Sequence, residues 1–257
     1  MFCEKISHSK RSTWAECRLK YKYKYVDYFE PFDPGSGSAM AFGSYIHRIL
    51  ELGVECTSLD QLLRIAEEER GNYDFEKSYE SKIEVCLRNF LRFNAQLSEA
   101  GRTEYWFHNE IEAGIASNGI IDRCVKGREG GLLIIDYKTS KREKTSFELS
   151  QDKQGMTYVD ATSDETGVPV EKIVFGHYYP LTNNFVTVRY NKAAILKNRK
   201  EIIREVWNIR KAKMEDLKPM ENQYCRWCEF RSGCSIHSPA PLIEETLKNA
   251  KKSERKK

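Results

Sequence analysis

The chain has 257 residues, of which 40% are hydrophobic, and a formal net charge of +4. This length is sufficient to bury a substantial core, so we expect one domain with elaborations. No apolar run is long enough to cross a bilayer, and the N-terminal residues lack the apolar core of a signal peptide. We therefore expect a soluble protein of the reducing cytoplasm, with no membrane partner.

Positive charge is concentrated at the C-terminus. The last ten residues carry six Lys and Arg against one Glu, so the rest of the chain is close to neutral. Net charge therefore identifies no polyanionic partner. We predict that residues 241–257 form a basic, disordered tail, because a segment of this kind has little apolar surface to bury.

The first hundred residues are predicted to be mostly helical. Thr13 and Glu16 have the spacing of a capping box, which predicts a helix that opens at Thr13 and contains Cys17. The turn-rich segment at residues 30–38 ends this element. Apolar residues at helical spacing then predict helices over residues 39–52, 59–70 and 79–97.

The rest of the chain is predicted to combine strands and helices. Strands are expected over residues 105–115, 119–126, 132–138, 172–180 and 185–190, and helices over residues 146–161 and 193–214. This order predicts an α/β fold with a central mixed sheet flanked by helices. We assign residues 1–240 to a single domain that has an N-terminal helical elaboration and a helical insertion at about residues 54–100.

The most informative segment is LLIIDYKTSK, at residues 132–141. Its apolar first half predicts a central strand that is buried on both faces. Side chains alternate along a strand, so Asp136 and Lys138 project to one side and Tyr137 to the other. A carboxylate and an ammonium placed in this way can hold a divalent cation and orient a water for attack on a phosphate. A salt-bridged strand end without chemistry is the alternative, and this motif alone leaves both open.

A second carboxylate, Asp122, lies in the segment GIID on the adjacent predicted strand. The glycine-rich turn GREGG between the two strands can bring Asp122 close to Asp136. Two carboxylates beside Lys138 form a site for a hard cation such as Mg²⁺ or Mn²⁺. An ion pair with Arg123, or a surface position, is the alternative for Asp122.

Two predicted helices carry polar residues that could extend this site. His47 lies in the segment FGSYIHRILE, with Glu51 one turn further along the same face. Imidazole can complete a metal site that contains two carboxylates. Gln154 and Tyr158, one turn apart on the helix after Lys138, could bind a phosphate or the lysine. A structural histidine and an ordinary polar helix face are the alternatives.

Three basic residues follow the strand that carries Asp136. Lys141, Arg142 and Lys144 lie beside the expected position of the scissile phosphate, so we predict that they bind DNA. Residues 10–25 are also basic and contain aromatic side chains that could stack on unpaired bases. The helical spacing of the tyrosines in that segment favours packing instead.

The cysteines are unevenly distributed. Of the eight, Cys225, Cys228 and Cys234 lie within ten residues, which favours a metal site over disulfides in a reducing compartment. A structural zinc site or an iron–sulfur cluster has four protein ligands. His237 would complete a zinc site that is local in sequence, whereas Cys17 would complete an all-thiolate site that joins the two ends of the chain. The spacing leaves both open.

Taken in order, the segments FGSYIHRILE, GIIDR, DYKTSK and Q-G-M-T-Y resemble the motif series of the RecB-type nucleases in the PD-(D/E)XK superfamily. The resemblance covers roughly residues 10–235. It implies a restriction-endonuclease-like core and a metal-dependent deoxyribonuclease. The metal ligands that it implies for Mg²⁺ or Mn²⁺ are His47, Asp122, Asp136 and the backbone carbonyl of Tyr137. Lys138 would be the catalytic lysine, acting with both aspartates, and Gln154 and Tyr158 would assist at the DNA phosphate.

The same resemblance favours the all-thiolate site. One early cysteine followed by a late C-x2-C-x5-C is the arrangement of the iron–sulfur nucleases of this group. They include the CRISPR-associated four-cysteine nucleases and the nuclease domain of AddB. The resemblance therefore implies that Cys17, Cys225, Cys228 and Cys234 hold a structural [4Fe–4S] cluster.

The leading hypothesis is an exonuclease that acts on DNA ends or single strands. A stand-alone phage or viral nuclease of recombination or replication fits the same motifs, as does a CRISPR-adaptation nuclease that processes prespacers with partner proteins. Two alternatives lack catalysis: a DNA-binding module that keeps the fold, and a zinc-binding interaction protein that requires His237. The intact set of His47, Asp122, Asp136 and Lys138 argues against a binding module.

Overall fold

The computed structural model describes residues 5–33 and 38–254. The chain forms two compact units. Unit 1 consists of residues 1–37 and 204–257, and unit 2 consists of residues 38–203. Unit 2 contains the predicted catalytic residues, and unit 1 contains the clustered cysteines. The single domain expected for residues 1–240 stays a prediction.

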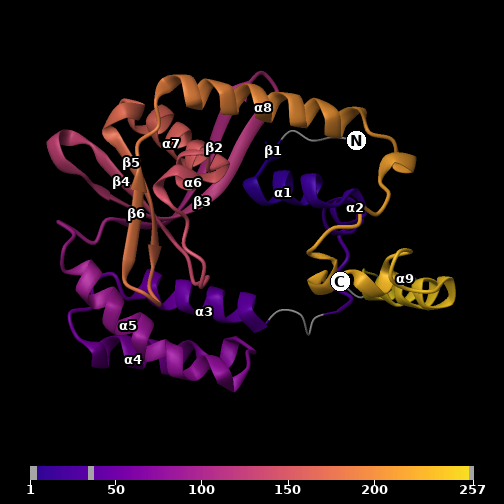
Figure 1. The fold of residues 1–257 in the computed structure, drawn as a ribbon, viewed down its shortest axis with the longest axis horizontal. Helices are drawn as coiled ribbons and strands as arrows, with labels where there is room; N and C mark the ends of the chain where they lie inside the picture. The colour runs from indigo at the N-terminus through magenta and orange to yellow at the C-terminus, as the bar shows by residue number, and fades with distance from the viewer. Residues whose placement is uncertain (1–4, 34–37, 255–257) are drawn as a thin grey trace. The chain divides into compact units, whose positions relative to one another are not determined.

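Unit 2 is built on a mixed sheet (Figure 1). Its strands, in order, are β2 (Arg102–Glu112), β3 (Ile115–Lys126), β4 (Leu132–Tyr137), β5 (Ile173–Tyr179) and β6 (Asn184–Val188). Neighbouring strands are antiparallel except β4 and β5, which are parallel. Parallel strands need a crossover connection, which α6 (Ser146–Ser150) and α7 (Lys153–Thr166) provide. The predicted α/β fold with a central mixed sheet is confirmed.

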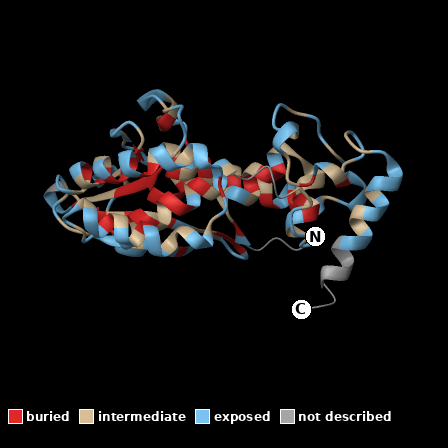
Figure 2. Cartoon of the chain, turned by 90° about the horizontal axis from the view of Figure 1, so that it is seen from below, coloured by how far each residue is buried: buried red, intermediate tan, exposed pale blue. Residues whose placement is uncertain are grey.

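Helices cover both faces of this sheet. α3 (Ser38–Leu52), α4 (Leu59–Glu69) and α5 (Glu80–Asn94) pack on one face, close to the ranges predicted for them. α6, α7 and the first part of α8 (Lys192–Lys211) pack on the other face. Buried residues, red in Figure 2, accordingly gather in the sheet and on the helix faces that touch it. The sheet therefore separates two hydrophobic cores.

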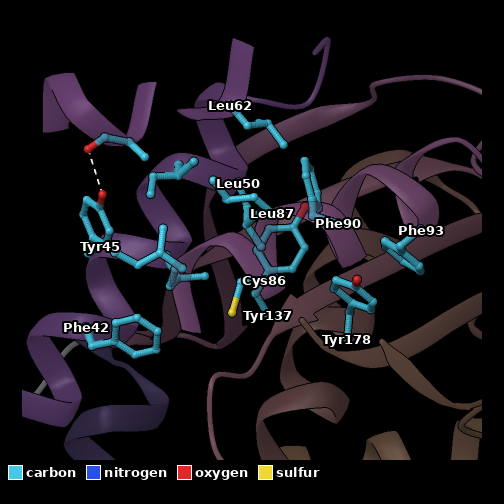
Figure 3. Packing of buried hydrophobic residues seen from close by; sticks show 14 of the residues in the cluster. Phe42, Tyr45, Leu50, Leu62, Cys86, Leu87, Phe90, Phe93, Tyr137 and Tyr178 are labelled. Carbon is cyan, nitrogen blue, oxygen red and sulfur yellow. Dashed lines mark hydrogen bonds between the residues drawn. The ribbon is translucent and has the colours of Figure 1, made fainter. Parts of the chain in front are cut away.

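The first core is strongly aromatic and joins α3, α4 and α5 to β4 and β5 (Figure 3). Phe93 of α5 stacks on Tyr178 of β5 with ring centroids 3.9 Å apart. Tyr45 of α3 donates a hydrogen bond of 2.7 Å to the carbonyl of Ala66 in α4. Aromatic pairs add about 1 kcal/mol each beyond the burial of their area. This packing holds α3 firmly against the strand that carries Asp136.

The single helix predicted over residues 146–161 is wrong, because the structure has two helices there. Asp152 separates them: its side chain accepts a hydrogen bond of 2.9 Å from the Gly155 N–H and so caps α7. A Cβ on Gly155 would lie 2.4 Å from Tyr190 Oη and 2.5 Å from the Phe175 ring. Gly155 therefore lets α7 lie close against β5.

The described residues of unit 1 include a short strand and several helices. They are β1 (Lys5–Ile6), α1 (His8–Glu16), α2 (Arg18–Tyr25), the end of α8, and α9 (Ala240–Glu254). Tyr23 of α2 packs against Phe29, Phe32 and Phe230. Its hydroxyl donates a hydrogen bond of 2.8 Å to the Gly233 carbonyl. This aromatic cluster ties α2 to the cysteine-rich segment. The packing role predicted from helical spacing holds for Tyr21, which is buried against Trp14, whereas Tyr28 is exposed.

The capping box predicted at Thr13 is wrong. Ser7 caps α1 instead, with its side chain accepting a hydrogen bond of 3.2 Å from the Lys10 N–H. Thr13 is buried inside α1, where its hydroxyl has no free helix terminus to cap. Cys17 lies between α1 and α2 with an extended backbone, at φ −159° and ψ 120°. The chain therefore bends at this cysteine rather than running through it as one helix.

The disordered tail predicted for residues 241–257 is wrong for most of its length. α9 spans Ala240–Glu254 and packs against the turn Arg231–Gly233. Ile243 and Leu247, one turn apart, are half-buried and supply the apolar stripe that the high charge of the segment concealed. Residues 255–257 lie outside the described part of the chain. No helix in the described part is both long and apolar enough to cross a membrane.

Candidate active site

Strand register brings two carboxylates together at one end of β4. Arg123 of β3 lies opposite Ile135 of β4, so Asp122 and Asp136 are the next residues to face each other along the two strands. Asp122 Oδ2 accepts a hydrogen bond of 2.7 Å from the Tyr137 backbone N–H. The backbone that precedes Lys138 is thereby fixed to the neighbouring strand.

Arg123, the alternative ion-pair partner of Asp122, forms its hydrogen bonds with other groups. Arg123 is fully buried, and its guanidinium donates hydrogen bonds of 2.7 Å and 3.2 Å to the carbonyls of Ala100 and Glu99. Successive side chains in a strand point to opposite faces, so Arg123 cannot neutralise the carboxylate beside it in sequence. Asp122 is left facing Asp136.

The two carboxylates repel each other. Burial, followed by the negative charge of Asp136, raises the pKa of Asp122 to about 8. A divalent cation would offset this repulsion, and carboxylate oxygens are the ligands that Mg²⁺ and Mn²⁺ prefer. The residues present therefore fit such an ion. Within the described ranges, no three His, Cys, Asp or Glu side chains have the arrangement of a preformed metal site.

Lys138 lies on the same side of β4 as Asp136, as strand alternation predicts. Its Nζ is 2.5 Å from Asp136 Oδ2 and donates a hydrogen bond of 3.3 Å to Gln154 Oε1. Gln154 Nε2 in turn donates to Tyr158 Oη at 2.8 Å. Burial acts to lower the pKa of Lys138, but the adjacent Asp136 carboxylate more than offsets it and the pKa is raised. The lysine is therefore held as an ammonium between β4 and α7.

His47 approaches the carboxylates from α3. Its Nδ1 lies 3.5 Å from Asp122 Oδ2, and its ring meets the Tyr137 ring edge-on at a centroid distance of 5.9 Å. Burial lowers the pKa of His47, although the charge of Asp136 opposes this effect. The neutral imidazole that results is the form that binds metal ions. The structure thus brings His47 to Asp122, as the predicted site requires.

An open pocket of about 620 Å³ lies next to His47. Its lining includes Glu51, which matched no predicted ligand and which accepts a hydrogen bond of 2.8 Å from Arg48. Glu104 of β2 also lines it, between Thr103 and Tyr105, which pair with the two neighbours of Asp122 on β3. Glu104 has a φ of 44°, unusual for a residue other than glycine. The sequence gives no signal for Glu104, because a glutamate in the alternating pattern of a strand is expected simply to face solvent.

His177 of β5 is a further residue that sequence analysis missed. It is buried and faces Asp136 across the parallel pair of strands, with Nε2 at 3.6 Å from Asp136 Oδ2. Burial lowers its pKa to about 4. The only signal in the sequence is an imidazole within the otherwise uncharged strand IVFGHYY. That signal could not reveal which residue of another strand lies opposite.

The basic residues predicted to bind DNA lie in the loop after β4. Lys141 is exposed, whereas Arg142 forms an ion pair with Glu148 and Lys144 forms one with the buried carboxylate of Asp152. The Lys144 ammonium keeps the pKa of the Asp152 carboxyl below its usual value, despite burial, which acts in the opposite direction. Binding of phosphate by these three residues stays a prediction.

The four cysteines of the predicted cluster line one small cavity in unit 1. Cys17, Cys225, Cys228 and Cys234 are half-buried free thiols around a space of about 30 Å³. Backbone N–H groups point at two of the sulfurs: Met220 N lies 3.4 Å from Cys17 Sγ, and Asn222 N lies 3.3 Å from Cys225 Sγ. His237 lines the same cavity. The candidate ligands of both predicted metal sites therefore line one cavity, and the binding of a metal there stays a prediction.

Known proteins with the same features identify the class. The sequence model of the PD-(D/E)XK nuclease superfamily matches residues 5–235. The chain therefore belongs to the PD-(D/E)XK nuclease superfamily. A crystal structure from Eubacterium rectale, described provisionally as an exonuclease, is similar with a TM-score of 0.54 and 14% identity, covering 87% of each chain. This likeness shows the shared fold.

More specific relatives come from streptococci. The chain is 29% identical over 198 residues to a subunit of an ATP-dependent helicase/deoxyribonuclease from Streptococcus agalactiae. It is 24% identical over 194 residues to the protein of the same name from Streptococcus mutans. Each match covers 68% of this chain, and the chain spans only 18% of the length of these relatives.

Proposed function

We propose that this protein is a metal-dependent DNA nuclease that hydrolyses phosphodiester bonds. The observation that carries the proposal is the group at the end of β4, where Asp122, Asp136 and Lys138 lie together. A module that only binds DNA has no use for a buried carboxylate beside a half-buried one, because both repel phosphate and are costly to remove from water. Membership in the nuclease superfamily supports the same conclusion.

Each residue of the site has a role in this proposal. The metal ligands would be His47, Asp122, Asp136 and the backbone carbonyl of Tyr137. When bound, Mg²⁺ or Mn²⁺ polarises a phosphoryl oxygen and makes a coordinated water a stronger nucleophile. The Lys138 ammonium would orient the attacking water and offset negative charge that develops on the phosphate. Gln154 of α7 accepts a hydrogen bond from that ammonium, and Tyr158 holds Gln154 in place.

The loop after β4 would contact the DNA backbone. Lys141 is exposed and can neutralise a phosphate directly. Arg142 is also exposed, so a phosphate can compete with Glu148 for its guanidinium. Lys144 would contribute mainly by holding the loop, because its ammonium pairs with the buried Asp152.

We further propose exonuclease action on DNA ends or single strands in a recombination setting. The support is that the streptococcal relatives are named as parts of a helicase/deoxyribonuclease, and that the Eubacterium rectale protein is provisionally an exonuclease. A CRISPR prespacer nuclease would use the same residues together with partner proteins. No contact among the described residues of the site favours that alternative.

A cleavage assay tests the activity and its mode together. Anaerobically purified protein is incubated with single-stranded and double-stranded DNA, labelled at the 5′ or the 3′ end, with Mn²⁺, with Mg²⁺ or with chelator. Metal-dependent release of labelled mononucleotides or short fragments from one end is the expected result. Internal fragments that appear before any terminal product would replace the exonuclease with an endonuclease. Tight DNA binding without cleavage under any metal would contradict the nuclease.

We also propose that Cys17, Cys225, Cys228 and Cys234 hold a structural [4Fe–4S] cluster. Support comes from the four thiols that line one cavity and from the backbone N–H groups that point at two of the sulfurs. Such N–H groups stabilise the negative charge of cluster-bound thiolates. The role would be structural, because phosphodiester hydrolysis transfers no electrons. A zinc site completed by His237 is the competing assignment.

A further inference from the structure

A chain of polar contacts leads from β4 through His177 and Tyr179 of β5 to the basic loop. His177 is 1% exposed and lies directly opposite Asp136 in the parallel register. Its Nε2 is 3.6 Å from Asp136 Oδ2, and among the described residues this nitrogen has no hydrogen bond of ordinary geometry. A buried ring nitrogen without a hydrogen-bond partner costs free energy. The position of His177 therefore calls for an explanation.

The contact of Nδ1, the other ring nitrogen of His177, determines which of the two nitrogens carries the proton. The Lys144 backbone N–H donates a hydrogen bond of 2.8 Å to Tyr179 Oη. The hydroxyl proton of Tyr179 is then available to His177 Nδ1, which lies 3.4 Å from the same oxygen. An Nδ1 that accepts a hydrogen bond carries no proton, so a neutral ring carries its proton on Nε2. That N–H faces Asp136.

We infer that His177 is a positioning residue that holds the Asp136 carboxylate through its Nε2–H, and that Tyr179 couples this contact to the loop that contains Lys144. The inference deepens the proposed nuclease function and rests on it. Both the Lys138 ammonium and the His177 ring approach Oδ2 of Asp136. Second partners of this kind fix the orientation of a metal-binding carboxylate.

The same chain of contacts also fixes the loop. Tyr179 holds the Lys144 backbone, and Glu143 accepts hydrogen bonds from Thr182 and from Asn184 in β6. The loop that is proposed to contact phosphate is therefore attached to β5 and to the turn that follows it. A shift of His177 would move the carboxylate and the loop relative to each other.

The tautomer can be measured on metal-free protein, independently of nuclease activity. The protein is labelled with ¹⁵N in its histidine rings, and long-range ¹H–¹⁵N spectra are recorded near neutral pH. His177→Gln identifies the signal of His177. We expect a neutral ring with its proton on Nε2, and we expect Tyr179→Phe to shift the Nδ1 resonance. A proton on Nδ1 in the wild type, or an Nδ1 resonance that Tyr179→Phe leaves unchanged, overturns the inference.

The positioning role is tested by comparing His177→Gln with His177→Leu. Glutamine can place an N–H near the position of imidazole Nε2, whereas leucine cannot donate. We expect leucine to lower kcat and Mn²⁺ affinity, measured by calorimetry, by roughly 10- to 100-fold with little change in KM for DNA. Glutamine should restore most of both losses. Circular dichroism and the melting temperature control for folding.

Two outcomes contradict the positioning role. One is wild-type kcat and Mn²⁺ affinity in His177→Leu, and the other is equal impairment of a folded His177→Gln. If the wild-type protein itself cleaves no DNA, the proposed function fails, and the calorimetric and spectroscopic results alone decide the inference about His177.

Discussion

At the residue scale, the site depends on a few charged groups placed by strand alternation and register. Alternation alone predicts that Asp136 and Lys138 share a side of β4, and the 2.5 Å contact agrees. The pairing with Asp122 follows from the short turn between β3 and β4. His177 could not be predicted, because its place opposite Asp136 depends on the register of two strands that are far apart in sequence.

Replacing Lys138 separates catalysis from DNA binding. We expect Lys138→Ala to lower kcat on the order of 10²- to 10⁴-fold with a nearly unchanged KM, because the ammonium acts on the reacting groups. Lys141→Ala is the matched control: it removes the same charge from an exposed position in the following loop. It should weaken DNA binding modestly and leave kcat close to normal. Equal cleavage by Lys138→Ala and wild type would falsify the catalytic assignment.

The raised pKa of Asp122 makes the stability of metal-free protein depend on pH. With a folded pKa of about 8, the folded state holds a proton that the unfolded state releases near pH 4. The contribution of Asp122 to the free energy of unfolding is therefore fully present at low pH and is lost as the pH rises toward 8. The lowered pKa values of His47 and His177 act oppositely, but only below about pH 6.5.

Urea unfolding of wild type and Asp122→Asn isolates this effect. Between about pH 6.5 and 8, the wild type should lose up to about 1 kcal/mol per pH unit relative to the variant. Addition of Mn²⁺ should abolish this difference in slope, because a cation favours the ionised carboxylate. Parallel pH profiles for the two metal-free proteins would show that Asp122 is ionised at neutral pH and that the carboxylates do not repel as described.

At the element scale, the position of α7 sets the geometry of the site, since Gln154 of this helix accepts a hydrogen bond from Lys138 and Tyr158 in turn holds Gln154. Helix existence could be predicted from apolar spacing, but the break between α6 and α7 could not. It depends on one side chain, Asp152, that caps a helix rather than continuing one. The bend at Cys17 was also missed. Because Ser7 and not Thr13 caps α1, this helix begins earlier than predicted and ends at Glu16, just before Cys17.

The close approach of α7 to β5 predicts a sensitive glycine. Gly155→Ala should destabilise the protein by about 1–3 kcal/mol, because its Cβ would meet Tyr190 and Phe175 at 2.4–2.5 Å. It should also lower kcat by moving Gln154, the adjacent residue. Gly71→Ala is the control, since a Cβ there meets nothing within 4 Å. Thermal unfolding measures both variants, and similar melting temperatures for the two would count against the packing described for α7.

At the scale of the whole molecule, the chain combines a nuclease-type unit with a unit that gathers four cysteines. The spacing of the late cysteines predicts a metal site, which stays a prediction. The two candidate fourth ligands could not be separated, because Cys17 and His237 both line the same cavity. The high charge of the C-terminus also concealed α9, whose apolar stripe is only a few residues wide.

Removing single ligands separates the two metal assignments. Cys17→Ser and Cys225→Ser should both lose iron and lower the melting temperature, because an iron–sulfur cluster bound by four thiolates needs each of them. His237→Ala should keep iron and stability close to wild type. Metal analysis and the visible absorption of anaerobically purified protein provide the readout. A colourless, zinc-loaded protein that tolerates Cys17→Ser and depends on His237 would instead establish the zinc site.

The most direct test of the central claim is the initial rate of DNA cleavage by Asp136→Ala compared with wild type, in Mn²⁺ and on end-labelled DNA. Asp164→Ala is the matched control. Asp164 is an exposed carboxylate near the far end of α7, and it forms an ion pair with Arg199 of α8. We predict metal-dependent cleavage that is lost in Asp136→Ala and kept in Asp164→Ala, while DNA binding persists in both. Cleavage by Asp136→Ala at the wild-type rate would contradict this claim, because the carboxylates of β3 and β4 would then not be the catalytic site.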